Sequence, residues 1–339
     1  LGPILFLIFI NDIASCVSYS TLRCFADDTR ICRSINTIEN MTELQHDLKE
    51  VTKWSVKNNM ALHEDKFEYI CHLSNKRNPL HELPFVHEQF QYKTLSGTTL
   101  RPVEQLRDLG ITVSKDLSWT SHIRSISDKA RKMAAWVFSV FHSRSTTVMV
   151  TLYKSLVRSH LEYCSPLWNP TKVGDIQELE SVQRTFTSKI HGLQHLHYWE
   201  RLKALSLMSL QRRRERYIVM HMWKILHGVT SNDLNVQFTK NSRLGILAKV
   251  PSVRKKSAVA HQTLYENSFS VMGPKLWNCI PSNIRAITKQ DRFKLPLTTF
   301  LLALPDKPPI RGFTSPNSNS ILDWRNDREA SALWGGQQL

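Results

Sequence analysis

The chain has 339 residues, of which 41% are hydrophobic, and it carries 45 basic and 29 acidic side chains. This length and composition favour a globular protein with room for two or three domains. Six cysteines without a C-x-x-C pair exclude a disulfide scaffold, so we expect reduced, mostly buried thiols in an intracellular protein of the nucleus or cytoplasm. The apolar run at residues 1–13 is shorter than the roughly 20 residues of a membrane-spanning helix and follows no basic segment. We therefore expect no signal peptide, no transmembrane segment and no membrane partner.

Charge is distributed unevenly along the chain. Residues 1–120 hold 13 basic and 15 acidic side chains, whereas residues 121–339 hold 32 basic and 14 acidic ones. Lys and Arg neutralise phosphates and release counterions, so the second region favours a polyanion such as a nucleic acid as its partner. The alternative is a generally basic protein without such a partner.

Two adjacent carboxylates, Asp27 and Asp28, lie between short runs in which apolar residues alternate. This alternation predicts a β-hairpin over residues 21–35 with the pair at its tip, where Asp tolerates the turn geometry. Taken alone, such a pair is more often a solvated turn. Adjacent carboxylates repel each other, however, and Mg²⁺ prefers a few carboxylates completed by water and substrate phosphates. Two such ions about 3.5–4 Å apart suit nucleotidyl transfer to a primer 3′-hydroxyl.

The flanking residues carry a resemblance. Residues 1–12 (LGPILFLIFIND) followed by residues 25–29 (FADDT) resemble the end of the B motif and the C motif of the reverse transcriptase of non-LTR, LINE-type retrotransposons, nearest to jockey-like elements. The resemblance implies that Asp27 and Asp28 bind two catalytic Mg²⁺ ions, for which Mn²⁺ can substitute. It also implies a pocket for template and incoming nucleotide shaped by Gly2, Pro3, Phe25 and Ala26.

The same resemblance implies an RNA-directed DNA polymerase that copies an RNA template onto a DNA primer from deoxynucleoside triphosphates. In the family, the fingers and the A motif, which supplies another metal-binding Asp, precede these motifs. This sequence lacks that segment, so we expect a C-terminal fragment that is inactive alone. Asp12 does not replace the missing residue, because it matches a position that is not a metal ligand. The alternative is a non-catalytic nucleic-acid-binding relic of such an element.

Beyond the hairpin, apolar spacing predicts an amphipathic helix over residues 39–59 with its stripe beneath a sheet, a stop at Asn58, and a strand over residues 67–73. Lys66 resembles the D-motif lysine proposed to protonate the pyrophosphate leaving group; an ordinary strand-edge lysine is the alternative. Residues 75–105 are rich in turn formers and predict a long connection. Residues 106–113 (LRDLGITV) resemble the E motif, a hairpin or primer grip in which Leu109 and Gly110 position the primer end.

From residue 121 the sequence becomes helical and basic. Helical spacing predicts helices over residues 122–143, 146–163, 174–191 and 291–304, with apolar positions 148, 152, 156 and 157 in the second. Residues 152–170 (LYKSLVRSHLEYCSPLWNP) strongly resemble the same retrotransposon family. We expect nucleic-acid contacts from Lys129, Arg131, Lys132, Lys154 and Arg158, and from Arg212, Arg213 and Arg214 on one exposed helix face. Residues 228–262 lack periodicity, which predicts a mobile basic loop that contains a cluster of three basic residues at 254–256.

The predicted fold is therefore α+β, with a partial antiparallel palm sheet backed by a helix and then a mainly helical region. We expect a partial palm at residues 1–120, a thumb-like region at 121–227, a basic C-terminal region at 228–304 and a poorly ordered tail at 305–339.

Overall fold

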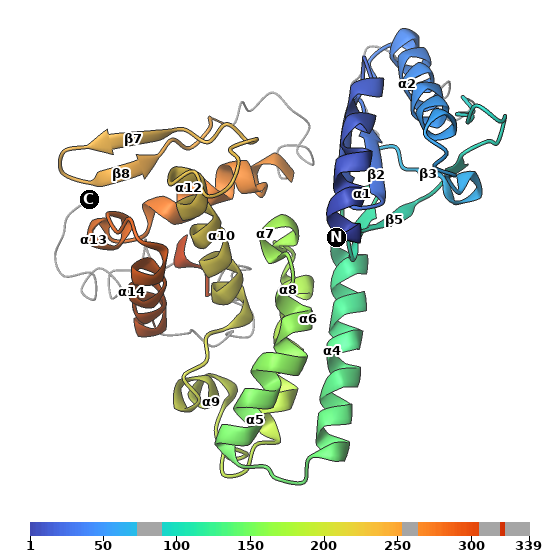
Figure 1. Ribbon diagram of the computed structural model, residues 1–339. Helices are drawn as coiled ribbons and strands as arrows, with labels where there is room; N and C mark the ends of the chain where they lie inside the picture. Colours follow the sequence, from blue (N-terminus) through green and yellow to red (C-terminus); the bar gives the residue numbers. More distant parts are fainter. Residues whose placement is uncertain (73–89, 253–263, 305–318, 323–339) are drawn as a thin grey trace. The chain divides into compact units, whose positions relative to one another are not determined.

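The computed structural model describes residues 1–72, 90–252, 264–304 and 319–322 (Figure 1). It divides the chain into two compact units, an N-terminal unit, Leu1–Trp119, and a C-terminal unit, Thr120–Leu339. Both units mix helices with small sheets, as an α+β fold requires. Within the described ranges the named strands form four separate two-stranded sheets, so one continuous antiparallel sheet is not seen there.

The N-terminal unit opens with two helical segments and a hairpin. Its elements are α1 (Gly2–Ile10), the 3₁₀ helix η1 (Asn11–Cys16), β1 (Thr21–Phe25), β2 (Asp28–Cys32) and α2 (Ile38–Lys57). The predicted helix is confirmed: Thr37 caps its start through a capping box, and Asn58 ends it. The stripe of α2 packs against Ile10, Ile13 and Leu22. The β1–β2 hairpin therefore packs on a core built from α1, η1 and α2.

The second half of this unit consists of short strands. After the 3₁₀ helix η2 (Glu64–Lys66), β3 (Glu68–Tyr69) pairs in parallel with β4 (Arg101–Pro102), and β5 (Gln105–Asp108) pairs antiparallel with β6 (Ile111–Ser114). The predicted strand over residues 67–73 is thus only two residues long where it is described, and residue 73 lies outside the described ranges. The hairpin predicted around Leu109 and Gly110 is confirmed.

The first half of the C-terminal unit is helical (Figure 1). It contains α4 (Thr120–Val140), α5 (Thr146–Leu152), the π-helix η3 (Tyr153–Val157), α6 (Arg158–Glu162), α7 (Ser165–Trp168), α8 (Val173–Ser188), α9 (Tyr198–Ala204) and α10 (Leu210–Leu226). The predicted helix over residues 146–163 is therefore interrupted by a π segment. Its buried residues are Met149, Tyr153, Val157 and Leu161. Of the predicted stripe only Val157 is buried, and Val148 is exposed. Tyr153 fixes this register, because its hydroxyl donates to Gln183 Oε1 at 2.7 Å inside the core.

The second half of the unit packs around α10. It contains β7 (Phe238–Asn241), β8 (Gly245–Ala248), α12 (Phe269–Asn278), α13 (Ser282–Arg285) and α14 (Gln290–Ala303). Their apolar residues, including Trp277, Phe293 and Leu297, join Trp223 of α10 in one core. The prediction that residues 228–262 form an irregular loop is wrong for the β7–β8 hairpin. The basic cluster at 254–256 and most of the predicted tail lie outside the described residues.

No described helix combines the length and the apolar character needed to cross a bilayer. The expectation of mostly buried thiols is wrong, because Cys24, Cys32 and Cys164 are exposed and only Cys279 is classed as buried. Cys32 lies on the outer face of the β1–β2 hairpin. Cys24 lies on the same face as Leu22 but closer to the turn, beyond the residues that contact the core.

Candidate functional site

The candidate site is the turn of the β1–β2 hairpin. A two-residue turn, Ala26-Asp27, joins the strands, and Ala26 adopts a left-handed conformation with φ of 53°. Asp28 opens β2 and pairs with Phe25. Asp27 therefore lies at the tip and Asp28 on the first rung, and both side chains are exposed. The prediction of a hairpin that carries the carboxylates at its end is confirmed.

The two faces of the hairpin differ in chemistry. Paired residues of an antiparallel ladder share a face, and successive residues alternate. Leu22 is buried opposite Ile31, and both contact the core. Phe25 and Asp28 lie on the other face, where Phe25 is 66% exposed. The hairpin therefore anchors one face in the core and leaves a carboxylate and an aromatic ring together on the outer face.

Asp47 of α2 fixes the chain that enters β1. Its carboxylate accepts the backbone N–H groups of Ser18, Tyr19 and Ser20 at 2.9, 3.0 and 2.7 Å. Burial by itself would raise the pKa of Asp47, but these donors outweigh burial and lower it. Asp47 is thus a positioning residue for the hairpin that the sequence analysis did not single out. Its spacing of three residues from Leu44 and four from Val51 puts it on the apolar stripe and is the signal that could have found it.

An ion pair connects the candidate site to the second hairpin of the same unit. Arg30 of β2 lies 2.6 Å from Asp108 of β5, through Nη1 and Oδ2. Asp108 precedes the turn Leu109-Gly110, where φ is 45° and 84°. Two successive left-handed residues define the twisted turn typical of two-residue hairpins, which glycine favours at its second position. The Arg30–Asp108 ion pair therefore connects the Leu109-Gly110 turn, the predicted primer grip, to the hairpin that carries Asp27 and Asp28.

In the described part of the chain, other predicted residues make no hydrogen bond or ion pair with the carboxylates. Gly2 and Pro3 begin α1 and are exposed, and Lys66 ends η2 with its side chain in solvent. Within the described residues, no hydrogen bond or ion pair joins any of these three to Asp27 or Asp28. Asp12, which the sequence excluded as a metal ligand, accepts the indole N–H of Trp54 at 3.1 Å.

The donor set at the turn suits a hard divalent cation. Two adjacent carboxylates offer oxygen ligands, and magnesium commonly uses one or two protein carboxylates while water and substrate phosphates complete its shell. Across the part of the chain that the structure describes, no group of three or more His, Cys, Asp and Glu side chains is arranged to hold a metal. The two carboxylates of the turn could therefore supply only part of the oxygen ligands of such an ion.

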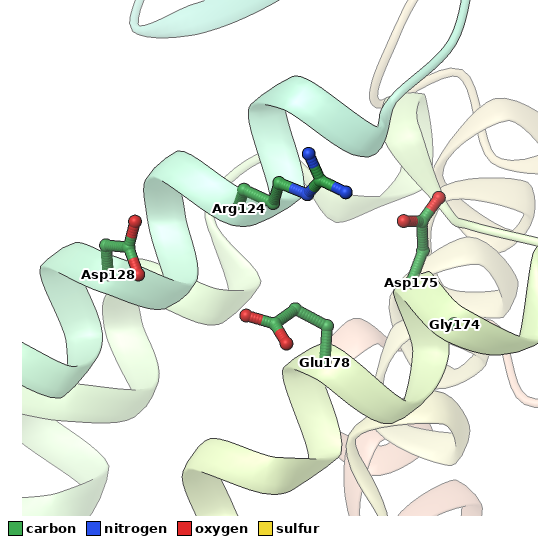
Figure 2. Close-up of a pocket in the computed structure, with 5 residues that line it drawn as sticks. All are labelled: Arg124, Asp128, Gly174, Asp175 and Glu178. Atoms are coloured by element: carbon green, nitrogen blue, oxygen red, sulfur yellow. The ribbon is translucent and has the colours of Figure 1, made fainter.

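Three predicted cations lie on α4 of the C-terminal unit. Lys129, Arg131 and Lys132 are exposed. Arg131 is held by Asp128 at 3.1 Å and by Glu178 at 2.7 Å. A neighbouring pocket of about 390 Å³ is lined by Arg124, Asp128, Gly174, Asp175 and Glu178, three of which are carboxylates (Figure 2). This pocket would repel a phosphate, which leaves Lys129 and Lys132 as the better placed cations of the three.

The three successive arginines of α10 correct the sequence prediction. Arg212 is 1% exposed and Arg214 is fully buried, so they do not form an exposed face with Arg213. Successive residues of a helix point about 100° apart, and α10 is covered by α7 and α8 as well as by α12 and α14. Arg212 donates to the carbonyl groups of Leu301 and Leu304. Arg214 donates through Nε to Asn169 at 3.0 Å, and burial lowers its pKa to about 10.

Comparison with known proteins places distant relatives among mobile elements. The chain is 22% identical over 200 residues to the probable RNA-directed DNA polymerase from transposon X-element of Drosophila melanogaster. It is 23% identical over 203 residues to the RNA-directed DNA polymerase from mobile element jockey of Drosophila funebris. Each match covers 57% of this chain and 21% of the relative, so the chain spans about a fifth of the length of the curated relatives it matches.

No protein-family model and no solved structure matches the chain. The two relatives support the reverse transcriptase family and a reverse-transcriptase-like function. Both are named as enzymes of the class RNA-directed DNA polymerase, which is the class that the sequence motifs indicated.

Proposed function

We propose that this chain is part of a retrotransposon RNA-directed DNA polymerase and carries part of its nucleotidyl-transfer site. The observation that supports this most is the placement of Asp27 and Asp28, exposed and adjacent at the end of a hairpin whose other face is anchored in the core. The distant similarity to two RNA-directed DNA polymerases supports the same class. The substrates are an RNA template, a DNA primer and deoxynucleoside triphosphates, in the nucleus or cytoplasm.

In this proposal Asp27 and Asp28 hold two magnesium ions, which Mn²⁺ can replace. When bound, these ions lower the pKa of the primer 3′-hydroxyl and neutralise charge on the leaving pyrophosphate. Asp47 keeps the carboxylates in place by fixing the segment before β1, and the Arg30–Asp108 ion pair keeps the Leu109-Gly110 turn near them. That turn supports the primer end.

Other residues act on the incoming nucleotide. The exposed ring of Phe25 shares its face with Asp28 and offers a stacking surface to a base or sugar. Gly2, Pro3 and Ala26 complete the pocket wall. Lys66, whose ammonium group is in solvent, donates a proton to the pyrophosphate oxygen as the bond to the α-phosphate breaks. In the C-terminal unit Lys129 and Lys132 contact the phosphate backbone of the primer–template duplex.

The isolated chain is proposed to be inactive. Two adjacent carboxylates provide only part of the near-octahedral oxygen shell of each magnesium ion, and two ions need more ligands than this turn offers. A second candidate function is a nucleic-acid-binding relic without catalysis. The observation that favours it is the concentration of positive charge in residues 121–339, where 32 basic side chains face 14 acidic ones.

Primer extension on an RNA template tests both candidates. The purified chain is supplied with a labelled DNA primer, Mg²⁺ and the four nucleotides, beside Asp27→Ala and the matched exposed control Asp65→Ala. We expect no extension by the chain and binding of the duplex by all three proteins. Template-dependent extension that Asp27→Ala abolishes would confirm the polymerase and contradict the proposed inactivity. Extension that survives Asp27→Ala would contradict the proposed site.

A further inference from the structure

Four cationic side chains lie close to one another where η3 and α6 meet α10, and one carboxylate pairs with two of them. Lys154 lies in the π-helix η3, Arg158 begins α6, and Arg213 and Arg216 lie one turn apart on α10. Glu162 of α6 accepts from Arg213 through Nε and, at 2.9 Å, through Nη2. Arg158 Nε lies 3.5 Å from the same carboxylate. Glu162 thus pairs closely with Arg213 and more loosely with Arg158.

Tyr217 completes this cluster. Its hydroxyl lies 3.0 Å from both Glu162 Oε2 and Arg213 Nη2, so it bridges the two. The guanidinium groups of Arg213 and Arg216 lie 5.6 and 5.8 Å from the centre of its ring. Both arginines are therefore held at defined positions by an aromatic surface.

The cluster has excess positive charge in a partly desolvated place. The side chains of Arg158, Arg213 and Glu162 are 13%, 15% and 10% exposed. Burial lowers the pKa of Lys154, Arg158 and Arg216, and the positive charge of Arg213 lowers each of them further. Cations crowded in this way are stabilised when an anion joins them, because charge-assisted hydrogen bonds are strong where water is limited.

The side chains also have the chemistry and access that a phosphate requires. Guanidinium groups offer paired N–H donors to phosphate oxygens, and an ammonium adds a point charge. Lys154 is exposed, and Arg158, Arg213, Arg216 and Tyr217 are each partly exposed. The π segment under Lys154 is a local irregularity of a kind that recurs at functional sites.

We propose that Lys154, Arg158, Arg213 and Arg216 form a binding site for a single phosphate group, with Glu162 and Tyr217 as the residues that orient the arginines. The phosphate belongs to a nucleic-acid backbone or to a free phosphate anion. If the phosphate belongs to a nucleic acid, this proposal rests on the proposed function; if it is a free anion, it does not. It also gives Arg213 the phosphate contact that its neighbours Arg212 and Arg214, being buried, do not make.

The test compares two double variants that remove the same charges. Lys154→Gln/Arg158→Gln alters the site, and Lys203→Gln/Arg292→Gln removes one exposed lysine and one exposed arginine elsewhere in the C-terminal unit. Lys154→Gln alone, with Lys203→Gln as its control, keeps the test decisive if the loss of Arg158 prevents folding.

Two probes distinguish the sources of phosphate. The first is the affinity for an RNA–DNA hybrid, measured by fluorescence anisotropy over a range of salt. We expect about tenfold weaker binding by the site variant and a salt slope smaller by about 0.9, as the loss of one phosphate contact requires, against less than about twofold weaker binding by the control. The second is the rise in melting temperature caused by inorganic phosphate relative to chloride at equal ionic strength, which the site variant should lose.

Each outcome has a fixed meaning. Selective loss of hybrid affinity assigns the phosphate to a nucleic acid, and selective loss of the response to inorganic phosphate alone assigns it to a free anion. Equal behaviour of site and control variants, or no response of the wild-type chain to either probe, overturns the proposal. Neither result bears on Asp27 and Asp28, which primer extension tests separately.

Discussion

The hairpin of the N-terminal unit and helix α10 of the C-terminal unit both contain runs of like charge, yet they place these charges in opposite environments. Asp27 and Asp28 are exposed, whereas Arg212 and Arg214 are 1% and 0% exposed. At the end of the hairpin, Asp27 in the turn and Asp28 at the start of β2 are both exposed to solvent, where their repulsion is screened. Three successive helical residues cover more than half of the helix circumference, so a helix packed on several sides must bury some of them.

The two regions also differ in where their support lies. The exposed carboxylates depend on a buried one, since Asp47 holds the chain before β1 through three backbone N–H groups. The buried arginines are themselves structural, because Arg212 joins α10 to the end of α14. We therefore propose that the exposed carboxylates serve chemistry and that the buried arginines serve the fold, and substitutions can test this difference.

The largest expected effect is from Arg212→Ala. The substitution removes a buried cation and leaves the carbonyl groups of Leu301 and Leu304 without this donor, so the free energy of unfolding should fall by about 3–5 kcal/mol. Urea denaturation followed by circular dichroism measures this free energy. The control is the exposed Lys203→Ala, whose free energy of unfolding should stay within about 0.5 kcal/mol of wild type. Equal stability of the two variants would contradict a structural role for Arg212.

A pH-dependent effect is expected from Glu215→Gln. Burial raises the pKa of Glu215 from 4.5 to about 7, while the backbone N–H of Ile321 donates to it at 2.8 Å. Between these two pKa values the folded state holds more protons than the unfolded state, so the contribution of Glu215 to stability falls as pH rises through this window. The isosteric amide avoids the buried charge and should be more stable than wild type at pH 8, by up to about 3 kcal/mol.

Urea unfolding at pH 4.5 and pH 8 measures this effect. The advantage of Glu215→Gln over wild type should be small at the lower pH and should grow at the higher one. An advantage that is independent of pH would show that Glu215 does not titrate in the folded protein within this window.

A smaller effect is expected from Asp47→Asn. The amide retains one acceptor oxygen and loses the charge that three N–H donors stabilise, which should cost about 2 kcal/mol. Because the pKa of Asp47 is lowered in the folded state, its contribution is present above its ordinary pKa of 3.8 and is lost as pH falls below that value. Thermal unfolding at pH 7 and pH 3 checks this: the difference between the variant and wild type should shrink in acid, whereas a constant difference would contradict the assignment.

Local sequence patterns predicted much of the fold. Helices α2, α4, α8 and α14 follow from spacing of apolar residues at three and four positions, and the β1–β2 hairpin follows from alternation around turn residues. The hairpin at Leu109 and Gly110 was predicted from the resemblance of residues 106–113 to a family motif. The β7–β8 hairpin could not be predicted in this way, because distant side chains hold it. Asn278 makes two hydrogen bonds with the backbone of Ala248, at 2.9 and 2.8 Å, and Arg285 donates to the carbonyl groups of Leu244 and Ile246.

The candidate site was predictable only in part, for the same reason. Asp27 and Asp28 are adjacent in sequence, one in the turn and one at the start of β2, so the local sequence pattern was sufficient to place them. Asp47 reaches residues that precede it by 27 to 29 positions, and Arg30 pairs with Asp108 in another hairpin. Such contacts depend on how elements pack, which single-sequence periodicity does not determine.

Metal binding at the hairpin tests the central claim most directly. Mn²⁺ binding is measured by water-proton relaxation, with and without a deoxynucleoside triphosphate, for the wild-type chain, Asp27→Asn/Asp28→Asn and the exposed control Asp65→Asn/Asp116→Asn. We predict that a nucleotide enhances Mn²⁺ binding, that the hairpin variant binds Mn²⁺ at least about tenfold more weakly, and that the control binds it as wild type does. The stability of both variants should stay within about 0.5 kcal/mol of wild type. Equal Mn²⁺ binding by the two variants would contradict the assignment of Asp27 and Asp28 as a nucleotidyl-transfer site.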